Sequence, residues 1–165
     1  MYHDPKTFLA VYGFESMTTA NVLAAVTDES LSREKAAGHN TLGDIAWHIA
    51  AAPFYMLNQI GFEIDESLNQ KPEQLTAAAI QETHRTSSAL VAEQAASKTP
   101  EDLAKVYHVF NMMDWSAGQM LGILLHHEIH HRGQLSVLLR QAGLIVPSIY
   151  GPTYEVTMEH LAKQA

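Results

Sequence analysis

The chain has 165 residues, which suits one compact domain, because domains commonly contain about 100–150 residues. Eighteen acidic residues against ten Lys and Arg give a net charge of -8, which makes nucleic acids and anionic membranes unfavourable partners. The absence of cysteine excludes disulfides, thiolate metal ligands and a cysteine nucleophile. Ten histidines, as many as all Lys and Arg together, are the unusual feature.

The sequence shows no signal for a membrane segment or for a second domain. No apolar run approaches the ~20 residues that a membrane-spanning helix requires. The N-terminus, MYHDPKTF, lacks the basic stretch followed by an apolar one that marks a secretory signal. We therefore expect a soluble, cytoplasmic protein with a single domain over residues 1–165.

The first part of the chain predicts a long helix and a short turn. Asp4 is a good N-cap, and Pro5 fits the first helical position, where its missing N–H costs nothing. The apolar spacing then predicts a helix to about Val26. Ser30 is expected to cap a short helical turn that ends at Gly38.

Two further helices are predicted in the middle of the chain. Thr41 and Asp44 form a variant of the capping box and open a helix to about Ile60. Pro53 lies inside this helix and predicts a kink, because proline removes one backbone hydrogen bond. Pro72 is expected to start a third, alanine-rich helix over residues 72–97.

The fourth helix is the best marked. Ser116 and Gln119 form a capping box, and Gly143 follows a helix predicted to end at about Ala142. Residues 104–113, before it, are compatible with extended structure. Four long helices without convincing strands predict an all-α fold, a four-helix bundle.

The run HHEIHHRGQ at 126–134 contains two pairs of histidines four residues apart. On a helical wheel with 100° per residue, His131 lies about 20° and His127 about 60° from the direction of Leu124. His130 and His126 lie about 120° and 160° away and are expected to face solvent or an oligomer contact. The same wheel places the core face on Met120, Leu121, Leu135, Leu138, Leu139 and Ala142.

His127 and His131 are therefore the pair that faces the bundle interior. Two imidazoles in this register can bind one metal ion, whereas two buried histidines without metal must each satisfy two ring nitrogens away from water. We favour metal binding over a pair of hydrogen-bonded core histidines. A catalytic site usually has a third protein ligand.

His48 is the leading third ligand, because it flanks the apolar stripe of the second predicted helix and can reach a neighbouring helix. The wheel alone leaves it equally consistent with a boundary histidine that has satisfied hydrogen bonds. His84 and His108 are weaker choices. The remaining histidines, His3, His39 and His160, lie near chain ends or in loops.

Glu128 lies about 40° from the core direction on the same wheel. It is compatible with a general base or with a group that orients a ligand imidazole. We favour a third interpretation, an ion pair with Arg132 four residues later. Residues 127–131 also satisfy the zinc-protease pattern H-E-x-x-H, but the bundle context and the lack of a peptide-binding strand disfavour a protease.

The run His127-x-x-x-His131-Arg132-Gly133-Gln134 resembles the signature of the DinB/YfiT-like metalloenzyme family. The segment 42–48, followed by Phe54 and Tyr55, resembles the histidine region on that family's second helix. The resemblance covers nearly the whole chain and implies a four-helix bundle, often dimeric, with a divalent metal. It places the metal ligands on His48, His127 and His131.

The resemblance also implies an activity. Characterised relatives include S-transferases that use bacillithiol or mycothiol, and a thiol-dependent maleylpyruvate isomerase. We therefore expect a metal-dependent enzyme, with zinc or nickel, that acts on a small-molecule substrate as a homodimer. Because the chain has no cysteine, any thiol must come from a low-molecular-weight cosubstrate.

Two other functions are compatible with these residues. One is a non-catalytic dimeric bundle that binds a structural or regulatory metal, and the other is a metal-dependent hydrolase with Glu128 as base. The tail at 147–154 is expected to be either a lid over the site or a surface loop.

Overall fold

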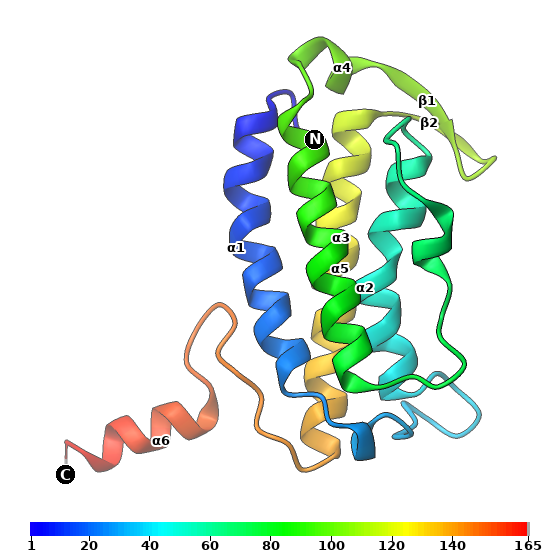
Figure 1. Cartoon of the computed structure of the whole chain (residues 1–165). Coiled ribbons are helices and arrows are strands. Elements are labelled where there is room, and N and C mark those ends of the chain that lie inside the picture. The colour runs from blue at the N-terminus through cyan, green and yellow to red at the C-terminus, as the bar shows by residue number, and fades with distance from the viewer. Residues whose placement is uncertain (165) are drawn as a thin grey trace.

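The computed structural model describes residues 1–164, apart from the side chain of Glu66. Four long helices run side by side as a bundle (Figure 1). They are α1 (Pro5–Ala24), α2 (Leu42–Asn58), α3 (Ala77–Ala96) and α5 (Ala117–Gln141). Helix α1 packs against α3 and α5, and α2 packs against the same two helices. The predicted four-helix bundle is confirmed.

Side-chain caps fix where all four of these helices begin. Asp4 accepts a hydrogen bond from the backbone N–H of Thr7 at 3.0 Å. The predicted capping boxes at the starts of α2 and α5 are both formed. Beyond the last residue of α5, Gly143 adopts a φ of 76°, the left-handed conformation that ends many helices.

The connections differ from the sequence prediction. Helix α3 begins at Ala77, with Thr76 as its N-cap, so the predicted start at Pro72 is wrong. Ser30 does not open a helical turn. It closes a short 3₁₀ turn over Asp28–Ser30, and its hydroxyl oxygen accepts from the backbone N–H of Thr27 at 3.1 Å. A second 3₁₀ turn covers Glu66–Asn69.

A small hairpin joins α3 to α5. After the short helix α4 (Pro100–Ala104), strand β1 (Val106–Val109) pairs antiparallel with β2 (Met113–Ser116). The expected extended segment is thus confirmed for β1, whereas the return strand β2 was not predicted. Figure 1 shows the hairpin over the end of α2.

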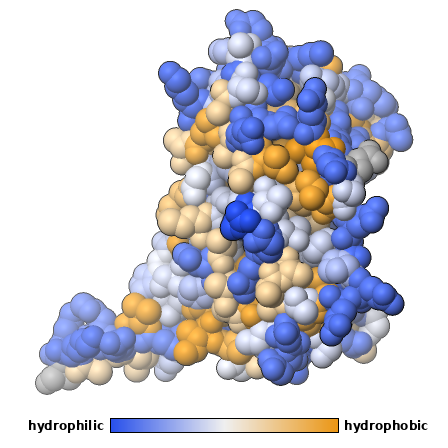
Figure 2. Space-filling model, viewed as in Figure 1, coloured by the Kyte–Doolittle hydropathy of each residue, from blue (hydrophilic) through white to orange (hydrophobic). Residues whose placement is uncertain are grey.

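The C-terminal helix α6 (Tyr154–Ala162) projects away from the bundle (Figure 1). The sequence analysis treated this region only as a tail. None of the residues of α6 is buried, and apolar surface is visible from the foot of the bundle towards this helix (Figure 2). Among the described residues, no helix combines the length and apolarity needed to cross a membrane.

The bundle interior contains two apolar clusters. One is formed around Phe8, Leu57 and Leu121 towards the hairpin, and the other around Leu23, Ile49 and Leu139 towards the opposite end. Buried polar side chains of α1, α3 and α5 lie between the two clusters. They are Glu15, Thr18, Thr19, His84, Ser87, Glu128 and Arg132. A polar layer therefore crosses the middle of the bundle.

Candidate metal centre

Three histidines meet between α2 and α5. His48 comes from α2, and His127 and His131 come from α5; each offers one ring nitrogen within 4.8 Å of those of the other two. The Nε2 atoms of His48 and His127 are 2.9 Å apart. The structure thus brings together the three residues that the sequence analysis selected as metal ligands.

The helical wheel correctly separated the histidines of α5. His127 and His131 are partly buried, whereas His126 and His130 are exposed. His48 is itself exposed at the edge of α2, which agrees with its predicted flanking position. The cluster therefore lies at the boundary between the bundle interior and solvent, where an ion and a small molecule have access.

The electrostatics of the cluster favour neutral imidazoles. The pKa of His127 is lowered from 6.5 to about 4, mainly by burial and further by the neighbouring imidazoles of His131 and His48. The pKa values of His48 and His131 are also lowered, mainly by burial. Neutral rings keep the lone pairs that a metal ion requires, so the donor set fits a divalent metal.

Gln134 holds the ring of His131 in place. The Nδ1 of His131 and the Oε1 of Gln134 are 2.8 Å apart. An amide oxygen can only accept, so Nδ1 carries the hydrogen and Nε2 keeps the free lone pair. Sequence reasoning quoted Gln134 as part of a motif but did not assign it this role. Its signal was the spacing of three residues from His131 on one helix.

An apolar pocket of about 370 Å³ opens beside His48 and His127. Phe110, at the tip of the hairpin, packs near Tyr55 of α2 with ring centroids 5.7 Å apart. Sequence reasoning missed this aromatic wall, Trp47, Tyr55 and Phe110, because the pocket combines residues of α2, the second 3₁₀ turn, the hairpin and α5. The pocket is lined by Trp47, His48, Ala51, Ala52, Tyr55, Met56, Asn69, Phe110, Ile123 and His127.

Glu128 is not paired with Arg132, so the favoured ion pair between them is wrong. Arg132 instead bonds to the carboxylate of Glu15 on α1, with Nη2 and Oε2 2.5 Å apart. The position of Arg132 on α5 directs its side chain towards α1. The sequence alone does not show that Glu15 is the acceptor there. Glu128 is buried, 4.0 Å from Nε2 of His84 on α3. Among the described residues, it does not line the pocket beside His48.

The other candidate histidines lie elsewhere. His84 is inside the bundle on α3, and His108 pairs with Asp114 across the hairpin at 2.8 Å. The segment 147–154, for which the sequence left a lid or a surface loop open, runs towards α1. There the hydroxyl of Tyr150 donates to the carboxylate of Glu15 at 2.7 Å.

The fold and the site together define a four-helix bundle with a cluster of three histidines between two of its helices. The chain belongs to the DinB family, whose model matches residues 1–162. It is 35% identical to the uncharacterised protein YrdA of Bacillus subtilis over an aligned stretch of 156 residues. This alignment covers 94% of this chain and 93% of YrdA.

Solved structures agree with this assignment. A DinB-like protein of Bacillus cereus superposes with a TM-score of 0.83 at 36% identity, over 91% of this chain and 100% of that one. The DinB-like protein YjoA of Bacillus subtilis gives 0.69 at 18% identity, over 87% and 97% of the two chains. YfiT of the same organism, described as a probable metal-dependent hydrolase, gives 0.55 at 17%, over 84% and 87%. The last two likenesses concern the fold alone.

Proposed function

We propose that the protein is a divalent-metal-dependent enzyme that acts on a small molecule. The observation that carries this proposal is the convergence of three neutral imidazoles beside an apolar pocket. His48, His127 and His131 would hold the ion, and all-imidazole ligation suits zinc or nickel. Three protein ligands are typical of a catalytic site, which keeps a position open, rather than of a closed structural one.

The favoured reaction is a thiol-dependent transfer or isomerisation. A bound divalent ion would lower the pKa of a thiol or water molecule placed beside it. The chain contains no cysteine, so the thiol is a low-molecular-weight cosubstrate. Trp47, Tyr55 and Phe110 would hold the apolar body of the second substrate and exclude water from it. Small thiols are kept reduced in the cytoplasm, which supports a cytoplasmic location.

A metal-dependent hydrolase is the second candidate, and the description of YfiT favours it. The position of Glu128 gives no support to that residue as the base, because it faces His84 of α3 at 4.0 Å and does not line the pocket beside His48. The third candidate is a non-catalytic dimeric bundle that binds metal. A homodimer is part of our proposal, and the exposed apolar side chains Tyr154, Met158 and Leu161 of α6 support it.

Metal content tests the site itself. Elemental analysis of tag-free protein should find about one zinc or nickel ion per chain. Each of the variants His48→Ala, His127→Ala and His131→Ala should lose it. His126→Ala is the matched control, because His126 lies on the same helix but is exposed. A parent protein that stays empty after incubation with zinc and nickel would remove the basis of the enzyme proposal.

Thiol dependence separates the two reactions. Metal-loaded protein is incubated with an apolar electrophile that also carries a hydrolysable bond, with and without a small thiol. A transferase consumes the thiol and forms a thioether only when both are present, whereas a hydrolase turns over without thiol. Turnover of neither kind, with a full metal site, would favour the non-catalytic bundle.

A further inference from the structure

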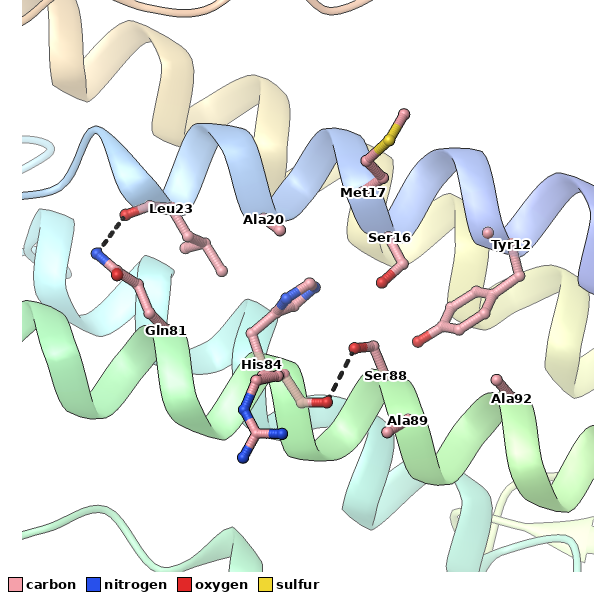
Figure 3. A pocket seen from close by; sticks show the side chains of 12 residues that line it. Tyr12, Ser16, Met17, Ala20, Leu23, Gln81, His84, Ser88, Ala89 and Ala92 are labelled. Carbon is pink, nitrogen blue, oxygen red and sulfur yellow. Dashed lines mark hydrogen bonds between the residues drawn. The ribbon is translucent and has the colours of Figure 1, made fainter.

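A second concave site lies on the opposite side of the bundle interior from the pocket described above. It is a groove of about 600 Å³ between α1 and α3 (Figure 3). The groove exists because small residues face one another there, so the two helices leave space between them. Its walls are formed by Gly13, Ser16, Met17, Ala20 and Leu23 of α1 and by Gln81, Arg85, Ser88, Ala89 and Ala92 of α3, with Tyr12 and His84 deeper in.

The floor of the groove is polar and incompletely bonded. His84 lines the groove although only 4% of its surface is exposed, and Glu128 behind it is equally buried. The Nε2 of His84 and the Oε1 of Glu128 are 4.0 Å apart, and neither has a hydrogen-bond partner among the described residues. Buried polar atoms without partners are costly and rare, so this pair requires a functional explanation.

The carboxylate of Glu128 determines what His84 presents to the groove. A carboxylate can only accept, so in the neutral imidazole it favours the hydrogen on Nε2, the nitrogen 4.0 Å from its Oε1. The other nitrogen, Nδ1, is then an acceptor and needs a donor. Figure 3 shows the imidazole standing between α3 and α1, inside the groove, with the hydroxyl of Tyr12 directed into the same space.

The rest of the groove reinforces this preference for a donor. The Ser88 hydroxyl donates to the carbonyl of Arg85 at 3.2 Å, which leaves its lone pairs free to accept. Arg85, the cation at the rim, is already engaged with Glu82 through two hydrogen bonds. With the imidazole of His84 neutral, no unpaired cation among the lining residues balances the Glu128 carboxylate, and the chain as a whole carries a charge of -8.

We propose that this groove is a second ligand site and that it binds small amines with an apolar body. The ammonium group donates to Nδ1 of His84 in the field of Glu128, and the apolar body lies along Met17, Ala20 and Ala89. The groove is a separate cavity from the pocket beside the three-histidine cluster, since its lining residues come from α1 and α3.

Three probes of equal shape test the chemistry of the head group. These are phenethylamine, 2-phenylethanol and phenylacetate, each titrated into the full-length, metal-loaded protein and followed by the NMR signals of the His84 ring. Phenethylamine should bind about tenfold more tightly than the alcohol, because a hydrogen bond from a charged donor is stronger than one from a neutral donor. Phenylacetate should bind most weakly.

Gly13→Leu locates the binding site without weakening the fold. A Cβ added at Gly13 meets no atom within 4 Å, and leucine favours a helix over glycine. This variant should fill the groove and reduce the affinity for phenethylamine at least about tenfold. Gly133→Leu is the matched control, because Gly133 is equally open but lies on α5. It should bind as the parent does.

His84→Phe tests the acceptor. Phenylalanine keeps a ring in the floor of the groove but lacks the nitrogen, so the preference for amine over alcohol should disappear. The proposal is overturned if phenethylamine shows no saturable binding up to about 10 mM, which corresponds to a negligible affinity. It is equally overturned if the three probes bind alike, or if binding is unchanged in both Gly13→Leu and His84→Phe.

Discussion

Arg132 is the largest fully buried side chain and ties α5 to α1. Its guanidinium bonds to the carboxylate and the carbonyl oxygen of Glu15 and to the hydroxyl of Thr19. The next residue towards the N-terminus is His131, so this ion pair also fixes the rotation of α5 that turns the histidines towards α2. Arg132, which the sequence predicted to pair with Glu128 on the same helix, thus holds α5 against α1.

Removing Arg132 should therefore be costly. In Arg132→Met the carboxylate of Glu15 stays buried without its cation, and we expect a loss of about 3–5 kcal/mol in unfolding free energy. Urea denaturation measures it. The double variant Glu15→Met with Arg132→Met should be clearly more stable than the single one, because no buried charge is left unpaired. Arg140→Met, which breaks an exposed pair with Glu155, should cost at most about 1 kcal/mol. Equal losses in all three would contradict this account.

Asp44 gives the fold a defined dependence on acid. Its hydrogen bond to Lys71, followed by that to the backbone of Thr41, lowers its pKa from 3.8 to about 2. A carboxyl whose pKa is lower in the folded than in the unfolded state stabilises the protein above the unfolded value. That contribution is lost as the pH falls through the folded value. The loss should therefore occur between about pH 4 and pH 2.

The variant Asp44→Asn keeps a side-chain oxygen that can accept from the backbone N–H of Thr41, but its amide group cannot ionise. Its thermal stability should fall less steeply than that of the parent protein between pH 4 and pH 2, and should be lower than the parent's at neutral pH. Lys71→Met removes the ion pair and keeps the capping box, so it should lie between the two. Parallel stability curves for the parent and Asp44→Asn across this range would show that Asp44 does not titrate as stated.

At the scale of elements, the sequence predicted helices wherever local signals agreed. Helix α5 was placed to within a residue because its capping box and its terminal glycine both act locally. The start of α3 was misplaced, because Pro72 is compatible with a helix start but Thr76 forms the actual cap. The hairpin was half foreseen, since its turn requires Phe110 and Asn111 at positive φ, which side-chain patterns do not indicate.

Two glycines show how the effect of a glycine-to-alanine substitution on stability depends on where the glycine lies relative to a helix. Gly13 lies inside α1 and Gly143 follows α5, and a Cβ meets no atom within 4 Å at either. Gly13→Ala should raise the unfolding free energy by about 0.5–1 kcal/mol, because alanine favours a helix. Gly143→Ala should lower it by about 1–2 kcal/mol, because its φ of 76° strains any residue with a Cβ. Chemical denaturation distinguishes them, and effects of the same sign would refute the argument.

At the scale of the whole molecule, the candidate site was predictable in part. The period of α5 selected His127 and His131, because facing the core is a property of one helix. The wheel could not choose His48, since that choice depends on how α2 lies against α5. The aromatic wall and the groove beside His84 combine elements that are distant in sequence, so neither could be derived from local patterns.

The division of the interior into two apolar clusters predicts how the molecule responds to loss of metal. Each cluster is built from residues of several helices, and the three histidines lie at the boundary with solvent rather than inside either cluster. The free energy of folding thus comes mainly from apolar burial, and a metal bound at the edge adds only its own binding energy.

Chelation should therefore leave the bundle folded. After treatment with EDTA and removal of the complex, the far-ultraviolet circular dichroism should keep its helical signal. Unfolding should stay cooperative, with a melting temperature lowered by no more than about 10 °C, since about 2–4 kcal/mol of ligand binding energy is lost. The variant His131→Ala should melt close to the chelated parent, because both lack the ion. Collapse of the helical signal on chelation would show instead that the metal holds the helices together, as it does in domains that fold only around their ion.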